Sequence, residues 1–191
     1  TGETVFSRLK DADFEKIKKA FFHVLRDVFS LLKQLLRNRQ IALAFDTTDE
    51  PYYGQIEGLW MHPQMPVQGS TGCFKFITVS CTDRHIKLIL GSLPVRIGAD
   101  KVKLVMELAE QARRFVTPDI LLFDRGFDDY QLVEALQRAG FRYQILWRKH
   151  KWSKKVFKQM KRGEMREVNR TRAYSRYKTR YKVKIRFVLI K

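Results

Sequence analysis

The spacing of apolar residues predicts an amphipathic helix over residues 11–37. Apolar side chains recur there at three- and four-residue steps, with charged residues between them. The apolar positions are Phe14, Ile17, Phe21, Leu25, Val28, Leu32 and Leu35. Asp11 or Asp13 can cap the start of the helix by accepting a hydrogen bond from a free backbone N–H. We expect the apolar stripe to dock on the rest of the domain or to connect it to another domain.

The pattern then changes to one typical of strands. The run "QIALAFD", residues 40–46, is short and apolar, which fits a strand covered on both faces, and it ends at Asp46. Residues 48–71 are rich in Pro, Gly, Tyr and Gln and predict a loop or an irregular ribbon. Two β-rich runs, "CFKFITVSCT" and "HIKLILGSLPV", follow on either side of a polar "DR" and predict a hairpin.

The next segment alternates between helix and strand patterns. Residues 99–115 predict a helix with Val102, Val105, Leu108, Ala109 and Ala112 on one face. The run "DILLFD" predicts a strand that ends at Asp124, and "FRYQILW" predicts another. Between them, residues 128–139 predict a helix that buries Leu132, Val133 and Leu136, with Gly140 at its C-cap. This order of elements indicates a mixed α/β sheet with right-handed crossovers.

The last part of the chain is basic. Residues 148–170 surround Trp152 with cations, and Val156, Phe157 and Met160 have helical spacing. Further on, Tyr181, Val183, Ile185 and Phe187 alternate with Arg180, Lys182, Lys184 and Arg186. Alternation at period two predicts a strand with one apolar face and one cationic face.

The charge of the chain is unevenly distributed. Of the formal net charge of +18, residues 1–140 supply +1, from 19 Lys+Arg and 18 Asp+Glu. Residues 141–191 supply +17, from 19 Lys+Arg and 2 Asp+Glu. A block of this kind indicates a polyanionic partner, of which nucleic acid is the commonest. The alternative is a basic face that only keeps the protein in solution.

Composition sets the class of the protein. With 191 residues, 45% of them hydrophobic, the chain can bury a core and is most simply one domain. No apolar run approaches the roughly 20 residues of a membrane-spanning helix, and no signal peptide is visible, so we expect a soluble intracellular protein. Cys73 and Cys81 fall on one predicted strand, too far apart to form a disulfide, and no histidine spacing suggests zinc. Because the chain starts at Thr1 and stops inside an apolar run, we expect a piece of a longer protein.

Two apolar strands of this sequence end in an aspartate, Asp46 and Asp124. Chemistry gathers at strand ends in open α/β sheets, and paired carboxylates are suitable ligands for Mg²⁺. Two such ions can hold the attacking and leaving oxygens of a phosphoryl displacement, and the basic C-terminal block points to a nucleic-acid phosphodiester as the substrate. The alternative is structural, since an aspartate at a strand end also forms turns and caps helices.

The run from residue 40 to residue 147 resembles the ribonuclease H-like catalytic domain of the DD-E insertion-sequence transposases. In that family one aspartate ends the first strand and a second ends the fourth, often in an "FDRGF"-like motif. Asp46 in "AFDTT" matches the first position, and Asp124 in "LLFDRGFDDY" matches the second. The resemblance implies a ribonuclease H-like mixed five-stranded sheet flanked by helices, with a basic insertion and an extra strand near the C-terminus.

The resemblance also implies an activity and a setting. It implies nicking and strand transfer at transposon ends, with Asp46 and Asp124 as catalytic residues that bind Mg²⁺ or Mn²⁺. The expected partners are transposon and target DNA, with a homo-oligomer forming on the DNA in the prokaryotic cytoplasm, associated with the nucleoid. It divides the chain into an N-terminal helical segment (1–39), a catalytic core (40–147) and a basic insertion with a terminal strand (148–191).

The third acid of the family is a glutamate on a helix after the last strand. After Glu134 this chain has only Glu164 and Glu167, both in the basic segment. We expect the family's glutamate to lie beyond Lys191; alternatively, Glu164 or Glu167 replaces it, or the domain is catalytically dead. A nuclease or resolvase of the same fold, or a catalytically dead nucleic-acid-binding module, are therefore alternative functions.

Residues that contact DNA are expected among the cations and around the tryptophan of the basic segment. Lys and Arg bind phosphates, and an indole ring can stack on an unpaired base. The candidates are Arg125, Arg148, Lys149, Lys151, Trp152, Lys154, Lys155, Arg180, Lys182 and Lys184.

Overall fold

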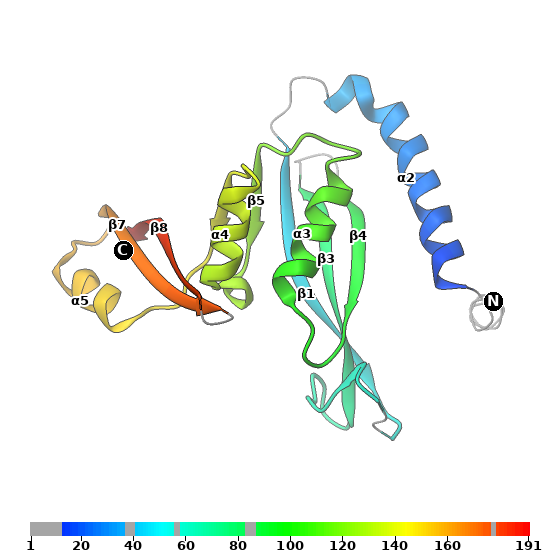
Figure 1. Ribbon diagram of the computed structural model, residues 1–191, viewed down its shortest axis with the longest axis horizontal. Helices are drawn as coiled ribbons and strands as arrows, with labels where there is room; N and C mark the ends of the chain where they lie inside the picture. The colour runs from blue at the N-terminus through cyan, green and yellow to red at the C-terminus, as the bar shows by residue number, and fades with distance from the viewer. Residues whose placement is uncertain (1–12, 37–40, 56–57, 83–86, 177–178) are drawn as a thin grey trace.

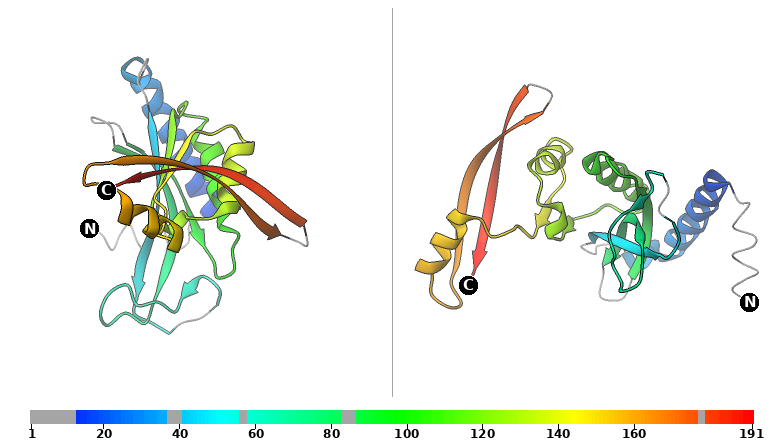
Figure 2. Two further views of the ribbon diagram at one scale, coloured as in Figure 1. Left: turned by 90° about the vertical axis from the view of Figure 1, so that its left-hand side faces the viewer. Right: turned by 90° about the horizontal axis from the view of Figure 1, so that it is seen from below.

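The computed structural model describes residues 13–36, 41–55, 58–82, 87–176 and 179–191. It consists of a six-stranded mixed sheet, a separate two-stranded sheet and the helices that accompany them (Figure 1). The amphipathic helix α2 and the C-terminal strands β7 and β8 lie at opposite ends of the long axis of the molecule (Figures 1 and 2). No helix among the described residues is both long and apolar enough to cross a membrane.

Strand β1 (Ala42–Tyr52) lies in the middle of the larger sheet. On one side it pairs antiparallel with β3 (Gly72–Thr82), which in turn pairs antiparallel with β4 (Lys87–Val95). On the other side it pairs parallel with β5 (Ile120–Phe123), which pairs parallel with β6 (Tyr143–Ile145). The five strands thus have the order β4-β3-β1-β5-β6, which confirms the ribonuclease H-like mixed sheet predicted from the sequence.

Two helices cover one face of this sheet. Helix α3 (Lys101–Ala112) connects β4 to β5, and its predicted apolar face is buried. Helix α4 (Tyr130–Arg138) connects β5 to β6 and buries the three residues that its spacing predicts. Gly140 ends α4 with φ 72°, a conformation that glycine adopts without the steric cost of a side chain.

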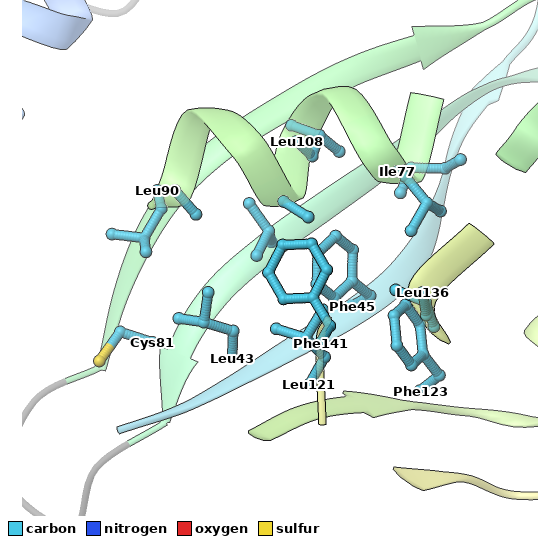
Figure 3. Close-up of a cluster of buried hydrophobic side chains, with 14 of the residues drawn as sticks. Leu43, Phe45, Ile77, Cys81, Leu90, Leu108, Leu121, Phe123, Leu136 and Phe141 are labelled. Atoms are coloured by element: carbon cyan, nitrogen blue, oxygen red, sulfur yellow. The ribbon is translucent and has the colours of Figure 1, made fainter. Parts of the chain in front are cut away.

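The core lies between the sheet and α3 (Figure 3). Alternate residues of neighbouring strands point into it, among them Leu43, Phe45, Ile77 and Leu121, each at most 2% exposed. The opposite face of β1 and β5 carries residues of intermediate burial, so the sheet has a well-covered side and a more open side. Cys73 and Cys81 are both buried on β3, and no disulfide joins them.

Strand β1 is longer than the sequence pattern indicates. It continues for six residues beyond Asp46, paired with β3 as far as Tyr52, so the prediction that the strand ends at Asp46 is wrong. The short strand β2 (Met61–His62) also pairs with β3, within the segment predicted as loop. Backbone pairing with β3, rather than an apolar pattern, maintains this extension. The pairing of β1 with β5 nevertheless stops at Phe45, one residue before Asp46.

Helix α2 (Phe14–Leu36) confirms the predicted N-terminal helix, but part of its predicted docking face is wrong. Leu25 and Phe29 are buried against the core, with Phe22 partly buried beside them. Phe22 and Phe29 stack on Phe115, with ring centroids 5.8 Å and 5.7 Å apart. Ile17 and Phe21, which the pattern placed on the docking face, are exposed. Residue 11, one of the two proposed caps, lies outside the described residues, as do residues 83–84 of the predicted hairpin turn.

The basic C-terminal segment forms a helix and a hairpin. Helix α5 (Lys151–Gln159) confirms the helical spacing there, and β8 (Thr179–Ile190) confirms the predicted terminal strand. Strand β7 (Met165–Arg176), which pairs antiparallel with β8 over its whole length, was not predicted. We call β7 and β8 the C-terminal hairpin. Its apolar side packs on Val133 of α4 through a small cluster separate from the main core.

Candidate active site and cationic hairpin

The pairing of β1 with β5 brings Asp46 and Asp124 side by side. The last paired residues of the two parallel strands are Phe45 and Phe123, and each aspartate is the next residue. Neighbouring strands lie about 4.8 Å apart, and successive side chains point to opposite faces. Asp124 keeps an extended backbone, φ −77° and ψ −176°. Both aspartates are therefore on the open face of the sheet, opposite the two buried phenylalanines, and both are exposed.

Each aspartate is oriented by a hydrogen bond from a nearby backbone amide. Asp46 Oδ1 accepts from the N–H of Thr47 at 2.8 Å, and Asp124 Oδ1 accepts from the N–H of Gly126 at 2.9 Å. Asp124 thereby caps the short 3₁₀ turn η1 (Arg125–Phe127), so the capping role considered from the sequence applies to this turn. Helix α4 has a different cap, Asp129. A carboxylate has further lone pairs, and capping leaves Asp124 able to bind another group.

Polar side chains continue from Asp46 across the sheet. Thr78 of β3 is directly opposite Asp46, and Ser92 of β4 is directly opposite Thr78. The hydroxyl oxygens of Thr78 and Ser92 are 3.0 Å apart, at hydrogen-bonding distance. Directly opposite residues in an antiparallel pair share a face, so these hydroxyls lie on the same face as the aspartates. The open face of the sheet is thus polar around Asp46.

A lysine that the sequence reading did not single out lies next to this site. Lys101, the first residue of α3, donates from Nζ to the carbonyl oxygen of Gly126 at 3.2 Å. The same ammonium lies 5.3 Å from the centre of the Phe127 ring. It therefore places a positive charge beside the turn that Asp124 caps. A lysine just after the helix cap Asp100 was the only sequence signal for it, because the contact depends on how α3 packs against the turn.

The donor atoms at this site fit a divalent metal only in part. Two carboxylates meet the requirement of Mg²⁺, which takes hard oxygen ligands and usually only one or two from protein, with water and phosphate completing its shell. Among the described residues, no group of three or more His, Cys, Asp or Glu side chains is placed to hold a metal. The pair of aspartates is therefore compatible with a metal that is also bound by its substrate.

The two later glutamates lie at the start of the C-terminal hairpin, Glu164 directly before β7 and Glu167 on it. Glu164 accepts hydrogen bonds from the backbone N–H of Lys161 and from Arg166, and the bond from Arg166, followed by that from Lys161, lowers its pKa. Glu167 lies on β7, with a carboxylate oxygen 3.9 Å from Arg186. Neither forms a cluster with Asp46 and Asp124. The structure thus gives no support to the alternative in which one of them replaces the family's glutamate.

The outer face of the C-terminal hairpin is cationic along β8. Arg180, Lys182, Lys184 and Arg186 are exposed at alternate positions, as predicted. Their partners on β7 are short and uncharged, namely Ser175, Ala173, Thr171 and Asn169 in the same order. A row of long cations beside a row of small residues leaves room for a phosphate backbone to approach. The inner face carries Val183, Ile185, Phe187 and Leu189, which are buried.

Three other predicted DNA contacts already have partners within the protein. Arg148 Nε lies 3.3 Å from Asp128 Oδ2, and Lys149 lies over the ring of Phe157. Trp152 is half-buried, with its ring packed edge-on against Phe187 and covered by the guanidinium of Arg170, 4.1 Å from its centre. The remaining predicted cations before the hairpin, Arg125, Lys151, Lys154 and Lys155, are exposed.

A cavity of about 960 Å³ lies between β6 and the C-terminal hairpin. Arg148, Lys149, Trp152 and Lys184 contribute to its lining, and so does the polar Gln144 of β6. Val133 and Gln137 of α4 line it as well, so the cavity lies at the β6 edge of the sheet, between α4 and the C-terminal hairpin. The structure therefore brings four of the predicted DNA contacts to one concave surface.

Comparison with known proteins gives similarity at the level of structure. No protein-family model matches the chain, and no curated protein sequence matches it. The piggyBac transposase in its synaptic complex with hairpin DNA is similar to 82% of this chain, with 13% identity and a TM-score of 0.49. The Mos1 transposase paired-end complex with the left transposon end is similar to 70%, with 11% identity and a TM-score of 0.34.

A retroviral assembly is also similar in structure. The simian T-cell lymphotropic virus intasome, in complex with PP2A regulatory subunit B56 gamma, is similar to 62% of this chain, with 9% identity and a TM-score of 0.37. This chain spans 36% of the piggyBac chain, 43% of the Mos1 chain and 36% of the intasome chain. Two of these three solved structures are transposase complexes.

Proposed function

We propose that this chain is the catalytic domain of a metal-dependent DD-E transposase that nicks DNA at transposon ends and transfers the cut strand. The observation that carries the proposal is the register of β1 and β5, which places Asp46 and Asp124 next to each other on the open face of the sheet. The charge of +17 in residues 141–191 supports DNA as the partner, because neutralising phosphates relieves the mutual repulsion of these cations.

The roles of the residues follow from their chemistry. Asp46 and Asp124 would hold Mg²⁺ or Mn²⁺, which when bound supplies neutralising charge at the phosphodiester and makes water or a hydroxyl more nucleophilic. In nicking, a water oxygen bonds to phosphorus and the bond to the 3′ oxygen breaks, leaving a 3′-hydroxyl. In strand transfer that hydroxyl bonds to a phosphorus of the target DNA and displaces another 3′ oxygen. Both steps balance without an oxidant or a reductant.

The cations of the C-terminal segment would hold the DNA. Arg180, Lys182 and Lys184 lie in the exposed row on β8, where phosphates can reach them without displacing another side chain. Arg148 and Lys149 would act from the cavity between β6 and the hairpin. Trp152 would contribute mainly by packing, because its ring is already covered by Phe187 and Arg170.

A second candidate function is a catalytically dead DNA-binding module. It is favoured by one observation, namely that Asp46 and Asp124 have no third metal-ligating side chain near them among the described residues. Such a module would keep the cationic hairpin and its DNA binding but would hold no metal. The two functions therefore differ in metal affinity at the aspartate pair, which can be measured directly.

The test is titration with Mn²⁺ by calorimetry, with and without a short DNA duplex. The wild-type chain is compared with an Asp46→Asn, Asp124→Asn double variant. Asp49→Asn is the matched control, because Asp49 is on the same strand but its carboxylate is 3.3 Å from the ammonium of Lys75. We expect the wild type and the control to bind Mn²⁺ and the double variant not to. Equal binding by all three chains, or none by wild type in the presence of DNA, would overturn the proposed metal site.

A further inference from the structure

Helix α2 carries two apolar stripes rather than one. The first stripe, formed by Phe22, Leu25 and Phe29, attaches the helix to its own domain through the main core and the stacked ring of Phe115. Since these contacts hold the helix at three successive turns, they fix the direction in which its other sides face. The rest of the apolar surface of α2 therefore has a defined orientation relative to the domain.

The second stripe faces outwards. Ile17 is 40% exposed, Phe21 37%, Val24 60% and Leu31 81%, and Val28 is half-buried between them. Their positions are separated by four, three, four and three residues along the chain. Large apolar side chains of this exposure, in a contiguous row, usually mark an interaction site. The exposed stripe is thus a surface that the fold of this domain orients but does not cover.

The spacing of the stripe indicates the kind of structure that covers it. In a heptad written abcdefg, the a positions of α2 are residues 14, 21, 28 and 35, and the d positions are residues 17, 24 and 31. The residues there are Phe14, Ile17, Phe21, Val24, Val28, Leu31 and Leu35, so every a and d position is apolar. A seam of period 3.5 keeps facing its partner only if the partner is another helix wound around it.

Most charged residues of α2 lie away from this seam; the two that border it in the sequence are Lys18, at an e position, and Asp27, at a g position. Lys16, Lys19 and Arg26 are exposed at c and f positions, on the side of the helix farthest from a and d. At the g positions that border the seam, Ala20 is small, and Asp27 forms an ion pair with Arg26 of its own helix, 3.5 Å away. The a and d positions thus carry no charge, and the two charged residues of α2 that border them have opposite signs, although the whole chain carries +18.

We propose that the exposed stripe of α2 pairs with the same stripe of a second copy of this chain, forming a two-helix coiled coil. A continuous a and d seam is complementary to itself, as a symmetric dimer interface requires. Nucleic acid does not fit, because the stripe offers no donor or cation to a phosphate. The inference rests on α2 alone, at the opposite end of the molecule from the C-terminal hairpin, and does not depend on the proposed catalytic function.

The size of the seam sets the strength of the pairing. The 23 residues of α2 span about 35 Å at 1.5 Å per residue. With a contact strip about 10 Å wide, the area per copy is roughly 350 Å², less than half of the ~800 Å² typical of a stable complex. The dimer is therefore a weak one, and we expect it to form at protein concentrations on the order of 100 μM.

Cysteine cross-linking tests the pairing directly, because both native cysteines, Cys73 and Cys81, are buried. Single variants Val24→Cys and Leu31→Cys place a thiol on the seam, and Ser30→Cys places one at an exposed c position outside it. At about 100 μM under mild oxidation, we expect covalent dimers to form at least tenfold faster for a seam variant than for Ser30→Cys. A mixture of Ile17→Cys and Leu31→Cys detects the antiparallel arrangement.

A second variant tests the pairing without relying on disulfide formation. Val24→Lys with Leu31→Lys puts charge on two of the most exposed seam residues, so the fold and its melting temperature are expected to stay unchanged. In sedimentation experiments, we expect this double variant to be monomeric where the wild type and Ser30→Lys dimerise. A wild type that is monomeric at 200 μM, seam cysteines no faster than Ser30→Cys, or a stripe that binds only lipid vesicles would each overturn the proposal. We expect the variant with Val24→Lys and Leu31→Lys to bind Mn²⁺ with the same affinity as the wild type. This result separates the test of pairing from the test of the metal site.

Discussion

Phe45 and Phe123 stack on the buried side of the sheet, with ring centroids 4.7 Å apart and an interplanar angle of 21°. They are the last paired residues of β1 and β5, and the residue after each of them is an exposed aspartate. Because side chains alternate along a strand, the same register that stacks the rings in the core places Asp46 beside Asp124 on the other face. The core thus fixes the distance between two carboxylates that it does not contact, and a rigid sheet is a suitable base for ligands that must not move.

Replacing either aspartate by asparagine removes one negative charge from the candidate metal site. In a protein with DNA-cleaving activity, we expect Asp46→Asn and Asp124→Asn each to lower cleavage at least about 100-fold, the loss of a few kcal/mol of transition-state stabilisation by the metal. Binding of the DNA, measured by fluorescence anisotropy, should stay within about twofold. Asp49→Asn is the control. Cleavage near the wild-type rate in either site variant would contradict the role of that aspartate.

Truncating Phe123 should loosen the register. Phe123 is 4% exposed and contacts both Phe45 and Phe127, so Phe123→Ala is expected to lower the free energy of unfolding by about 3–5 kcal/mol. Denaturant titration measures this value. Ile89→Ala changes a residue of the same sheet that is 52% exposed, so it should lower the free energy of unfolding much less than Phe123→Ala does. A loss below about 1 kcal/mol at Phe123 would show that the stack is not needed for stability.

A methyl group at Gly126 should disturb the site without disturbing the fold. A Cβ there would lie 3.0 Å from Asp124 Oδ1, so the carboxylate would have to move by a few tenths of an ångström. We expect Gly126→Ala to weaken Mn²⁺ binding about tenfold, because ligands must keep their geometry closely, and to leave the melting temperature nearly unchanged. Arg125→Ala changes the same turn without this contact and is the control. Unchanged Mn²⁺ affinity in Gly126→Ala would argue against Asp124 as a ligand.

The salt dependence of DNA binding tests the hairpin. Each phosphate contact contributes about 0.9 to the slope of log affinity against log salt concentration for duplex DNA. Changing Arg180, Lys182, Lys184 and Arg186 to Gln should therefore reduce the slope by up to about 3.6. The control is the triple change of Lys16, Lys19 and Arg26 to Gln on α2, at the far end of the molecule, which should leave the slope unchanged. Equal slopes for the wild type and the hairpin variant would remove the hairpin from the DNA interface.

Docking of the C-terminal hairpin should weaken at alkaline pH. Burial, with a hydrogen bond to Glu134 as the next cause, raises the pKa of Tyr174 from 10.0 to about 12. The folded state therefore holds the proton of Tyr174 more tightly than the unfolded chain does. The stability that protonated Tyr174 contributes is complete below pH 10 and is lost as pH rises towards 12. We expect the stability difference between wild type and Tyr174→Phe to shrink over this range in thermal melts. A difference independent of pH would contradict the raised pKa.

The order of the core elements and the adjacency of the two aspartates could be predicted because both depend on apolar runs and their ends. The runs ending at Asp46 and Asp124 each have a strong pattern, and parallel pairing of two such strands brings their ends together. The length of β1 could not be predicted, since residues 47–52 are mostly polar and include Pro51. Proline is tolerated there because β1 has no β5 partner beyond Phe45 and is an edge strand in that region.

Strand β7 was not predicted because basic residues occupy inward-facing positions where a strand pattern would have apolar ones. Arg170 and Arg172 occupy positions opposite Ile185 and Val183, on the side of the hairpin that packs against the domain. The guanidinium of Arg170 stacks on Trp152. Long basic side chains can bury their methylene groups while the charged end stays paired or in contact with water. Lys101 could not be found for a different reason, since its contact with Gly126 arises from the packing of α3 and leaves no local pattern.

The parallel pairing of β1 with β5 also determines when the site can exist during synthesis. Phe45 and Phe123 are 78 positions apart, so at about 5–20 residues per second β5 emerges from the ribosome roughly 4–16 seconds after β1. In that interval β1 can pair with β3, which is much closer in the sequence, while the edge of β1 that later pairs with β5 stays unpaired. Asp46 is therefore synthesised several seconds before Asp124, and the nascent chain passes through a stage that contains only half of the candidate metal site.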